Sequence, residues 1–116
     1  MVRLTGACHC GAVSVSLPAP PAEITRCNCT LCSKLGVTWG YYPPADVILN
    51  DAPLDEYRRA DVATPSLAFD RCATCGCTIR WRSLVERDPP STGINMNLFD
   101  VAGIAVRHHD GRSHRK

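Results

Sequence analysis

The chain has 116 residues, which suits a single domain, and 45% of them are hydrophobic and 21% charged. These proportions exclude a disordered chain, and every apolar run is far shorter than the roughly 20 residues that cross a bilayer. The formal charge of +2 is too small to favour a nucleic-acid partner. Residues 107–116 hold four basic residues and one acidic residue, so we expect one domain over residues 1–116 with a basic tail at about residues 107–116.

Short runs of β-forming residues, separated by Pro and Gly, predict a mainly β, antiparallel fold without a long helix. The first run alternates Val13, Val15 and Leu17 with serines, as a half-buried strand does. We expect no more than one helical turn at Leu31–Leu35 and a loop over residues 83–93. The expected strands, in chain order, are Val13–Leu17, Ile24–Cys29, Val37–Tyr42, Val47–Leu49, Leu54–Arg58, Leu67–Arg71, Thr78–Arg82, Ile94–Phe99 and Ile104–His108.

The N-terminal residues 1–6 contain no apolar stretch of the kind found in secretory signals. We therefore expect a cytoplasmic, reducing location. In such a compartment clustered cysteines are more often metal ligands than disulfide partners.

Eight cysteines fall into three tight clusters, and this spacing is the most informative feature of the chain. Thiols two or three residues apart can converge on one metal ion, and zinc prefers four ligands in a tetrahedron. The clusters are Cys8-His9-Cys10, Cys27-Asn28-Cys29-Thr30-Leu31-Cys32 and Cys72-Ala73-Thr74-Cys75-Gly76-Cys77.

Two of the clusters suit one closed metal site. Cys72 and Cys75 have the Cys-x-x-Cys spacing of a zinc knuckle, and Gly76 follows where the chain must turn. Cys8 and Cys10 would point the same way on an extended strand. Together they predict a four-thiolate structural zinc site, Cys8/Cys10/Cys72/Cys75, that joins the two ends of the chain.

The middle cluster offers three thiolates, Cys27, Cys29 and Cys32, within six residues. Three protein ligands and one vacant position form the pattern of a catalytic zinc, here a second and more labile one. The vacant position would accept water or an outside thiolate, since soft ligands favour another sulfur.

Three other interpretations of the cysteines stay open at this point. The cysteines could form disulfides, or one four-thiolate site could leave the other four cysteines incidental. Four of them could also hold an iron–sulfur cluster. The one-residue spacings argue against disulfides, and the pairs match zinc knuckles better than an iron–sulfur cluster. We therefore favour two metal-binding groups, one closed and one open.

The clusters and their neighbours resemble those of the glutathione-dependent formaldehyde-activating enzyme family, also seen as the centromere protein V-type domain. The resemblance spans roughly residues 4–110 and lies in the motifs Gly6-Ala7-Cys8-His9-Cys10-Gly11-Ala12-Val13, Cys27-Asn28-Cys29-Thr30-Leu31-Cys32-Ser33-Lys34, Phe69-Asp70-Arg71-Cys72-Ala73-Thr74-Cys75-Gly76 and Ile94-Asn95-Met96-Asn97-Leu98-Phe99-Asp100. The chain departs from the family at Asn28, where His is frequent, at Ser33, where Arg often precedes the Lys, and at Cys77, where Thr or Ser is usual.

The resemblance implies a β-tent fold around a structural zinc at Cys8, Cys10, Cys72 and Cys75, and an activity-linked zinc at Cys27, Cys29 and Cys32. It also implies a carbon–sulfur lyase that acts on a thiol adduct such as S-hydroxymethylglutathione, with a glutathione-like thiol and a small aldehyde as partners. The alternative hypothesis is a non-catalytic zinc-binding module of the same fold that binds another macromolecule.

Several residues near the middle cluster are candidates for supporting roles. Arg26 and Lys34 could offset the thiolate charge, and Arg58 and Arg59 could bind substrate carboxylates or be solvated strand residues. Trp39, Tyr41 and Tyr42 could wall a pocket or pack in the sheet, and Cys77 could be a spare ligand or a packed core residue. The tail histidines His108, His109 and His114 could bind metal or be exposed without function.

Overall fold

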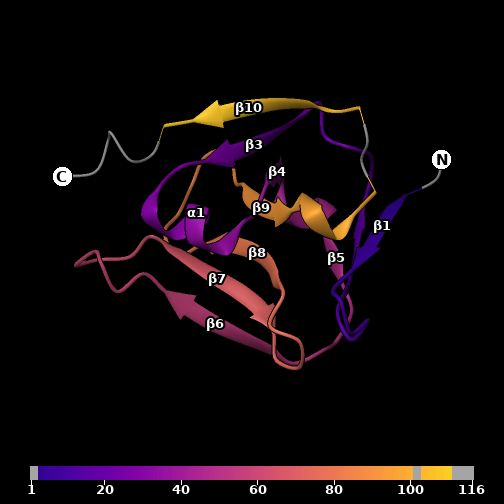
Figure 1. Cartoon of the computed structure of the whole chain (residues 1–116), viewed down its shortest axis with the longest axis horizontal. Helices are drawn as coiled ribbons and strands as arrows, with labels where there is room; N and C mark the ends of the chain where they lie inside the picture. Colours follow the sequence, from indigo (N-terminus) through magenta and orange to yellow (C-terminus); the bar gives the residue numbers. More distant parts are fainter. Residues whose placement is uncertain (1–2, 101–102, 111–116) are drawn as a thin grey trace.

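The computed structural model describes residues 3–100 and 103–110 as a mainly β structure with one short helix (Figure 1). Within these residues, no helix is long and apolar enough to cross a membrane. The elements are β1 (Leu4–Ala7), β2 (Ser14–Leu17), β3 (Glu23–Cys27), α1 (Thr30–Leu35), β4 (Trp39–Tyr42), η1 (Pro44–Asp46), β5 (Ile48–Leu49), β6 (Leu54–Arg58), β7 (Leu67–Cys72), β8 (Thr78–Ser83), β9 (Thr92–Asn95), η2 (Met96–Leu98) and β10 (Ala105–His109).

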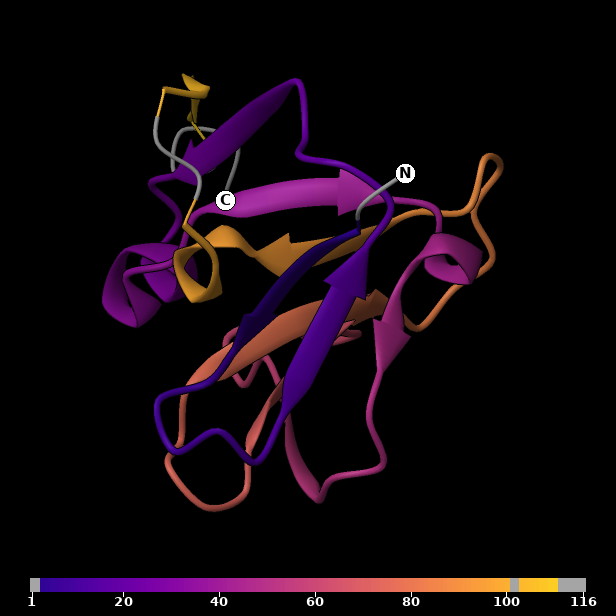
Figure 2. The ribbon, with the colours of Figure 1, turned by 90° about the vertical axis from the view of Figure 1, so that its right-hand side faces the viewer.

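The strands form two sheets. The smaller one has the order β1-β2-β5, and the larger one has the order β10-β3-β4-β9-β8-β7-β6. In Figure 2, β1 and β2 lie in front of the larger sheet, so the small sheet covers one side of it. All pairs are antiparallel except β10 with β3, which is parallel, with His109 opposite Cys27.

Two groups of buried residues hold the fold together. The first fills the space between the sheets and includes Val13, Val15 and Leu17. The alternation seen in the sequence is therefore the inner face of β2 together with Val13 just before it. The second is centred on Trp39 and Phe69 and packs against α1 and its cysteines. Trp39 and Tyr42 of β4 belong to different groups, as the pleat of a strand requires.

Most expected elements differ from the observed ones by one or two residues at an end, as for the strand expected over Ile24–Cys29, which is β3. Four other differences matter more. β1 was not expected, because residues 4–7 carry little apolar patterning. The strand expected over Ile94–Phe99 is wrong in its second half: β9 ends at Asn95, whose side chain accepts a hydrogen bond from the Asn97 N–H and starts η2. β9 also begins earlier than expected, since Thr92 and Gly93 of the expected loop belong to this strand. The mainly β, antiparallel fold is confirmed, and the parallel pairing of β10 with β3 is the one pairing within the described residues that departs from it.

Candidate metal centres and active site

The four cysteines of the first and third clusters meet between two turns, one from each sheet. Cys8 and Cys10 lie in the turn between β1 and β2, and Cys72 and Cys75 lie at the end of β7 and in the turn to β8. These two turns lie side by side at the lower edge of Figure 2. Their four sulfurs all lie within 4.8 Å of one another.

The spacing of these sulfurs suits a tetrahedral metal ion. The Sγ of Cys10 lies 3.7 Å from that of Cys8 and 3.6 Å from that of Cys72. A tetrahedron with metal–sulfur bonds of about 2.3 Å places its sulfurs about 3.8 Å apart. The group could therefore hold a metal ion such as zinc with little rearrangement.

The backbone around this group is arranged to stabilise thiolates. The N–H groups of Thr74 and Cys75 donate to Cys72 Sγ at 3.3 and 3.4 Å, and the Val13 N–H donates to Cys8 Sγ at 3.3 Å. The tight turn needs a left-handed residue after Cys75, and Gly76 supplies it with φ of 79°. Donors aimed at sulfur favour the charged form that a metal requires.

The pKa values of the four thiols follow these contacts. Hydrogen bonds from the backbone of Cys10 and Cys77 lower the pKa of Cys75 to about 5. The N–H of Cys75 lowers the pKa of Cys72 below its usual range. The Ala12 N–H would lower the pKa of Cys10, but desolvation and the neighbouring Cys72 and Cys8 sulfurs raise it to about 12. A cation at the centre would favour the charged form of all four sulfurs, including that of Cys10.

The middle cluster is built by the start of α1. Cys27 ends β3, Cys29 is the N-cap of the helix, and Cys32 lies in its first turn. Cys29 caps with its sulfur, which accepts the Cys32 N–H at 3.3 Å, and Gly36 ends the helix with φ of 68°. This tight loop gathers the three sulfurs within 4.8 Å of one another.

Each of the three sulfurs accepts an N–H donor. Cys27 Sγ accepts the Cys29 N–H at 3.5 Å, and Cys32 Sγ accepts the indole N–H of Trp39 at 3.4 Å. Burial alone would raise the pKa of Cys29, but hydrogen bonds from Cys32 and Cys27 lower it below its usual range. Burial raises the pKa of Cys32 to about 12. This donor set also fits a soft metal ion, and it contains three sulfurs instead of four.

A cavity of about 340 Å³ opens in front of these three sulfurs. Four aromatic side chains line it in two tilted pairs: Trp39 with Phe69, whose ring centroids are 6.1 Å apart, and Tyr41 with Trp81 at 6.0 Å. Its polar lining includes Arg59, Arg87 and His109. Such a volume, apolar with a few convergent polar groups, is of the size that binds a small molecule.

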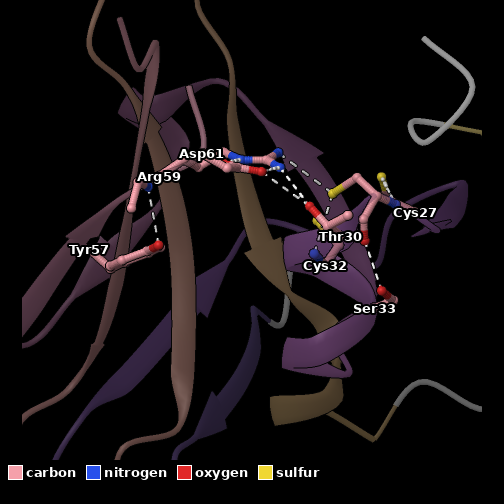
Figure 3. Close-up of polar contacts among 9 residues, drawn as sticks. Cys27, Thr30, Cys32, Ser33, Tyr57, Arg59 and Asp61 are labelled. Carbon is pink, nitrogen blue, oxygen red and sulfur yellow. Dashed lines mark hydrogen bonds and ion pairs between the residues drawn. The ribbon is translucent and has the colours of Figure 1, made fainter. Parts of the chain in front are cut away.

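Arg59 connects the β6–β7 loop to the cysteine loop (Figure 3). Its Nη1 lies 3.7 Å from Cys29 Sγ, and its Nε and Nη2 donate to the carboxylate of Asp61 at 2.9 and 2.8 Å. Nη2 also donates to Thr30 Oγ1 at 3.1 Å, and Thr30 Oγ1 donates to Asp61 at 3.2 Å. Arg59 thus places a fixed positive charge beside the sulfur of Cys29.

The parallel strand β10 borders the same cluster. The Asn28 N–H donates to the His109 carbonyl at 3.1 Å, and the Asn28 side-chain amide donates to Asp110 at 3.1 Å. His109 lies opposite Cys27 in the strand register and lines the cavity. The first three residues of the expected basic tail, Arg107 to His109, therefore belong to the sheet. His114 lies outside the described residues.

Some of the other candidate residues line the cavity, and the rest lie elsewhere in the fold. Trp39 and Tyr41 wall the cavity, whereas Tyr42 packs in the core between the sheets and donates its hydroxyl to the Ala19 carbonyl at 2.8 Å. Arg58 is exposed and forms an ion pair with Glu56 at 2.7 Å. Arg26 and Lys34 are not among the residues lining the cavity in front of the three sulfurs, as far as the structure describes the chain. Cys77 is half-buried and packs against the core between the sheets.

Sequence reasoning missed Phe69, Trp81 and Arg87 as residues of this cavity. Phe69 and Trp81 are strand partners in the β7–β8 register, so they reach the cysteines only through the pairing of distant strands. A Cβ on Gly93 would collide with the Trp81 indole, so the glycine makes room for this wall. The alternation of β8 is the one signal that could have suggested Trp81.

Comparison with known proteins gives the family of the chain. The family model described as glutathione-dependent formaldehyde-activating enzyme matches residues 3–110. The chain belongs to this family. The match includes every cysteine of the three clusters and nearly the whole chain.

A solved structure supports the fold. The crystal structure of a Rhodobacter sphaeroides protein is similar to this one with a TM-score of 0.69, at 23% identity, over 90% of this chain and 100% of that chain. At that identity the likeness concerns the fold alone. No curated protein sequence matches the chain.

Proposed function

We propose that this member of the family is a zinc-dependent carbon–sulfur lyase that acts on a thiol adduct such as S-hydroxymethylglutathione. One observation carries the proposal: three cysteine sulfurs within 4.8 Å of one another face a cavity of about 340 Å³. Membership of the family supports glutathione and formaldehyde as the thiol and the aldehyde.

The two cysteine groups have different proposed roles. Cys8, Cys10, Cys72 and Cys75 supply four sulfurs, which complete a tetrahedron, so the zinc held there would be structural. Cys27, Cys29 and Cys32 supply three and would hold the second, more labile zinc. A zinc ion bound there would supply a coordination position at which the pKa of a substrate thiol is lowered toward neutrality. A reducing compartment such as the cytoplasm would keep these thiols from oxidation.

The chain's own groups would prepare the site for this chemistry. Arg59 offsets negative charge at Cys29, and the Trp39 indole N–H does the same at Cys32. The aromatic walls exclude water from one side of the reacting sulfur and strengthen these electrostatic contacts. The open side of the cavity admits a small aldehyde.

The reaction itself is a balanced addition. The substrate thiol gives up its proton to solvent, its sulfur forms a bond to the aldehyde carbon, and the carbonyl π electron pair moves to oxygen, which takes a proton from solvent. The product is a hydroxymethyl thioether. The reverse step breaks the carbon–sulfur bond and returns aldehyde and thiol.

The test is the rate of exchange between glutathione and its formaldehyde adduct, measured by NMR exchange spectroscopy against the uncatalysed rate. We expect acceleration by the zinc-loaded chain and a return to the uncatalysed rate in Cys27→Ser. Cys77→Ser, which removes a half-buried thiol outside both proposed sites, should keep the acceleration. A wild-type rate equal to the uncatalysed rate, with zinc bound at the three cysteines, would contradict the proposal.

A further inference from the structure

We propose that Arg87 is the specificity-determining residue of this site and selects thiols that carry a carboxylate on a short carbon chain. The inference rests on the proposed thiol chemistry and assigns one part of the substrate to one side chain. Arg87 lies in the loop between β8 and β9, within the loop expected over residues 83–93.

Arg87 is held in place at the rim of the cavity. Its guanidinium carbon lies 5.7 Å from the centroid of the Trp81 ring, over its face, and its Nε donates to Ser83 Oγ at 2.8 Å. Trp81 is itself confined, because it lies against Gly93 with no space for a Cβ. A guanidinium stacked on an aromatic face keeps its orientation and its charge.

The guanidinium of Arg87 differs from those of the neighbouring arginines in its ion pairing. Arg59 is paired with Asp61, and both Arg80 and Arg82 are paired with Asp70. Arg87 forms no ion pair with any acidic side chain among residues 3–100 and 103–110, although Glu86 is next to it in the chain. Its Nη1 and Nη2 are therefore available to a ligand.

The position of Arg87 sets the chemical class of that ligand. Arg87 lines the same cavity of about 340 Å³ as Cys27, Cys29 and Cys32, so a molecule in this space can meet both the sulfurs and the guanidinium. A planar guanidinium with two parallel N–H groups matches a carboxylate, with which it forms two hydrogen bonds. Thiol at one end and carboxylate at the other is the pattern this cavity accommodates.

The test compares two thiols of nearly the same shape, 3-mercaptopropionate and its neutral amide, 3-mercaptopropionamide. Both tryptophans of the chain line the cavity, so intrinsic fluorescence reports binding without turnover. The zinc-loaded wild type should bind the carboxylate about tenfold more tightly than the amide, a modest preference because Arg87 is exposed.

Arg87→Gln should reduce this preference to less than about twofold, because it weakens the binding of 3-mercaptopropionate and leaves that of the amide unchanged. Arg87→Lys should leave an intermediate preference. Arg58→Gln removes an exposed arginine that is paired with Glu56 outside the cavity, and it should keep the wild-type preference. Thermal melting shows that each variant is folded.

The outcomes separate the two proposals. Equal binding of both thiols by the wild type, or equal weakening of both in Arg87→Gln and Arg87→Lys, would overturn the role of Arg87 and leave the thiol site intact. Failure of the wild type to bind either thiol would contradict the proposed function and this inference with it.

Discussion

The four-cysteine group and the three-cysteine group place the same side chain in different surroundings. The first gathers sulfurs from two turns far apart in the chain, since Cys10 meets Cys72, and it supplies four sulfurs. The second gathers its sulfurs from six consecutive residues at the start of one helix, and its three sulfurs face a cavity. The comparison teaches that the different roles proposed for the two groups rest on the number of sulfurs and on what lies beside them, more than on residue type.

Breaking the four-cysteine group should have the largest effect. In Cys75→Ser we expect loss of the cooperative thermal transition and of soluble protein. The apparent binding free energy of a structural zinc, about 10–16 kcal/mol, is comparable to or larger than the whole stability of a domain. Circular dichroism melting and zinc content measure this, with Cys77→Ser as the control that removes a nearby thiol. A stable, fully folded Cys75→Ser would contradict the structural role.

Breaking the three-cysteine group should instead spare the fold. In Cys27→Ser we expect one zinc per chain in place of two, a melting temperature within a few degrees of wild type, and about a hundredfold loss or more of catalysed exchange. Elemental analysis and NMR exchange measure these together. Cys27 is half-buried, so the substitution leaves little cavity in the core. Unfolding as severe as in Cys75→Ser would remove the distinction between the two groups.

An ion-pair network on the large sheet gives a reference value for the loss of stability expected at the four-cysteine group. Buried Asp70 accepts hydrogen bonds from Arg80 at 2.9 Å and from Arg82 at 2.6 and 2.9 Å. Burial would raise the pKa of Asp70, but these arginines lower it below its usual range. Asp70→Asn should cost about 2 kcal/mol of unfolding free energy at pH 7, less than loss of the zinc staple, because both arginines keep partial access to water.

The pH dependence of this effect follows from the sign of the shift. Because the folded pKa is depressed, the contribution is present above about pH 4 and is lost as the pH falls through the folded value. Urea denaturation at pH 7 and below pH 4 measures this contribution. The difference in unfolding free energy between wild type and Asp70→Asn should be smaller in acid. Asp55→Asn, which affects an exposed pair with Arg71 at 3.9 Å, should change stability by less than about 0.5 kcal/mol. Equal effects at the two positions would contradict the role given to burial.

The smallest expected effect concerns the charge beside the three-cysteine group. Arg59→Gln removes the guanidinium 3.7 Å from Cys29 Sγ and should lower affinity for the second zinc about tenfold, without changing the zinc at the four-cysteine group. Chelator competition measures both affinities. Arg58→Gln is the matched control, since the adjacent side chain pairs with Glu56 in solvent. Equal affinities in Arg59→Gln and wild type would show that Arg59 only holds the loop.

Local patterns predicted much of the fold. The mainly β class is confirmed, and the expected strand Leu54–Arg58 coincides with β6. The strand expected over Ile94–Phe99 was wrong in its second half because a single side chain determines the backbone there: Asn95 ends β9 by capping η2. The parallel pairing of β10 with β3 also could not be predicted, because strand order depends on contacts between residues some 80 positions apart, as for Arg107 and Thr25.

The cysteine spacing predicted which sulfurs lie together, and the structure brings both groups into place. The cavity was beyond reach, because Phe69, Trp81 and Arg87 come from strands and a loop whose pairing the sequence does not encode locally. Arg58 and Arg59 were considered either as carboxylate-binding residues or as solvated strand residues. Arg58 is exposed and paired with Glu56, and Arg59 is paired with Asp61. The family resemblance is confirmed by the match over residues 3–110.

Native mass spectrometry of the reduced chain, before and after mild chelation and with glutathione added, tests the difference between the two groups most directly. We predict two zinc ions per chain, one of them lost to the chelator, and a glutathione adduct only on the form that holds both. A single zinc per chain already before chelation, with Cys27, Cys29 and Cys32 all alkylated by iodoacetamide in that untreated chain and no glutathione adduct, would contradict the assignment of an open metal site.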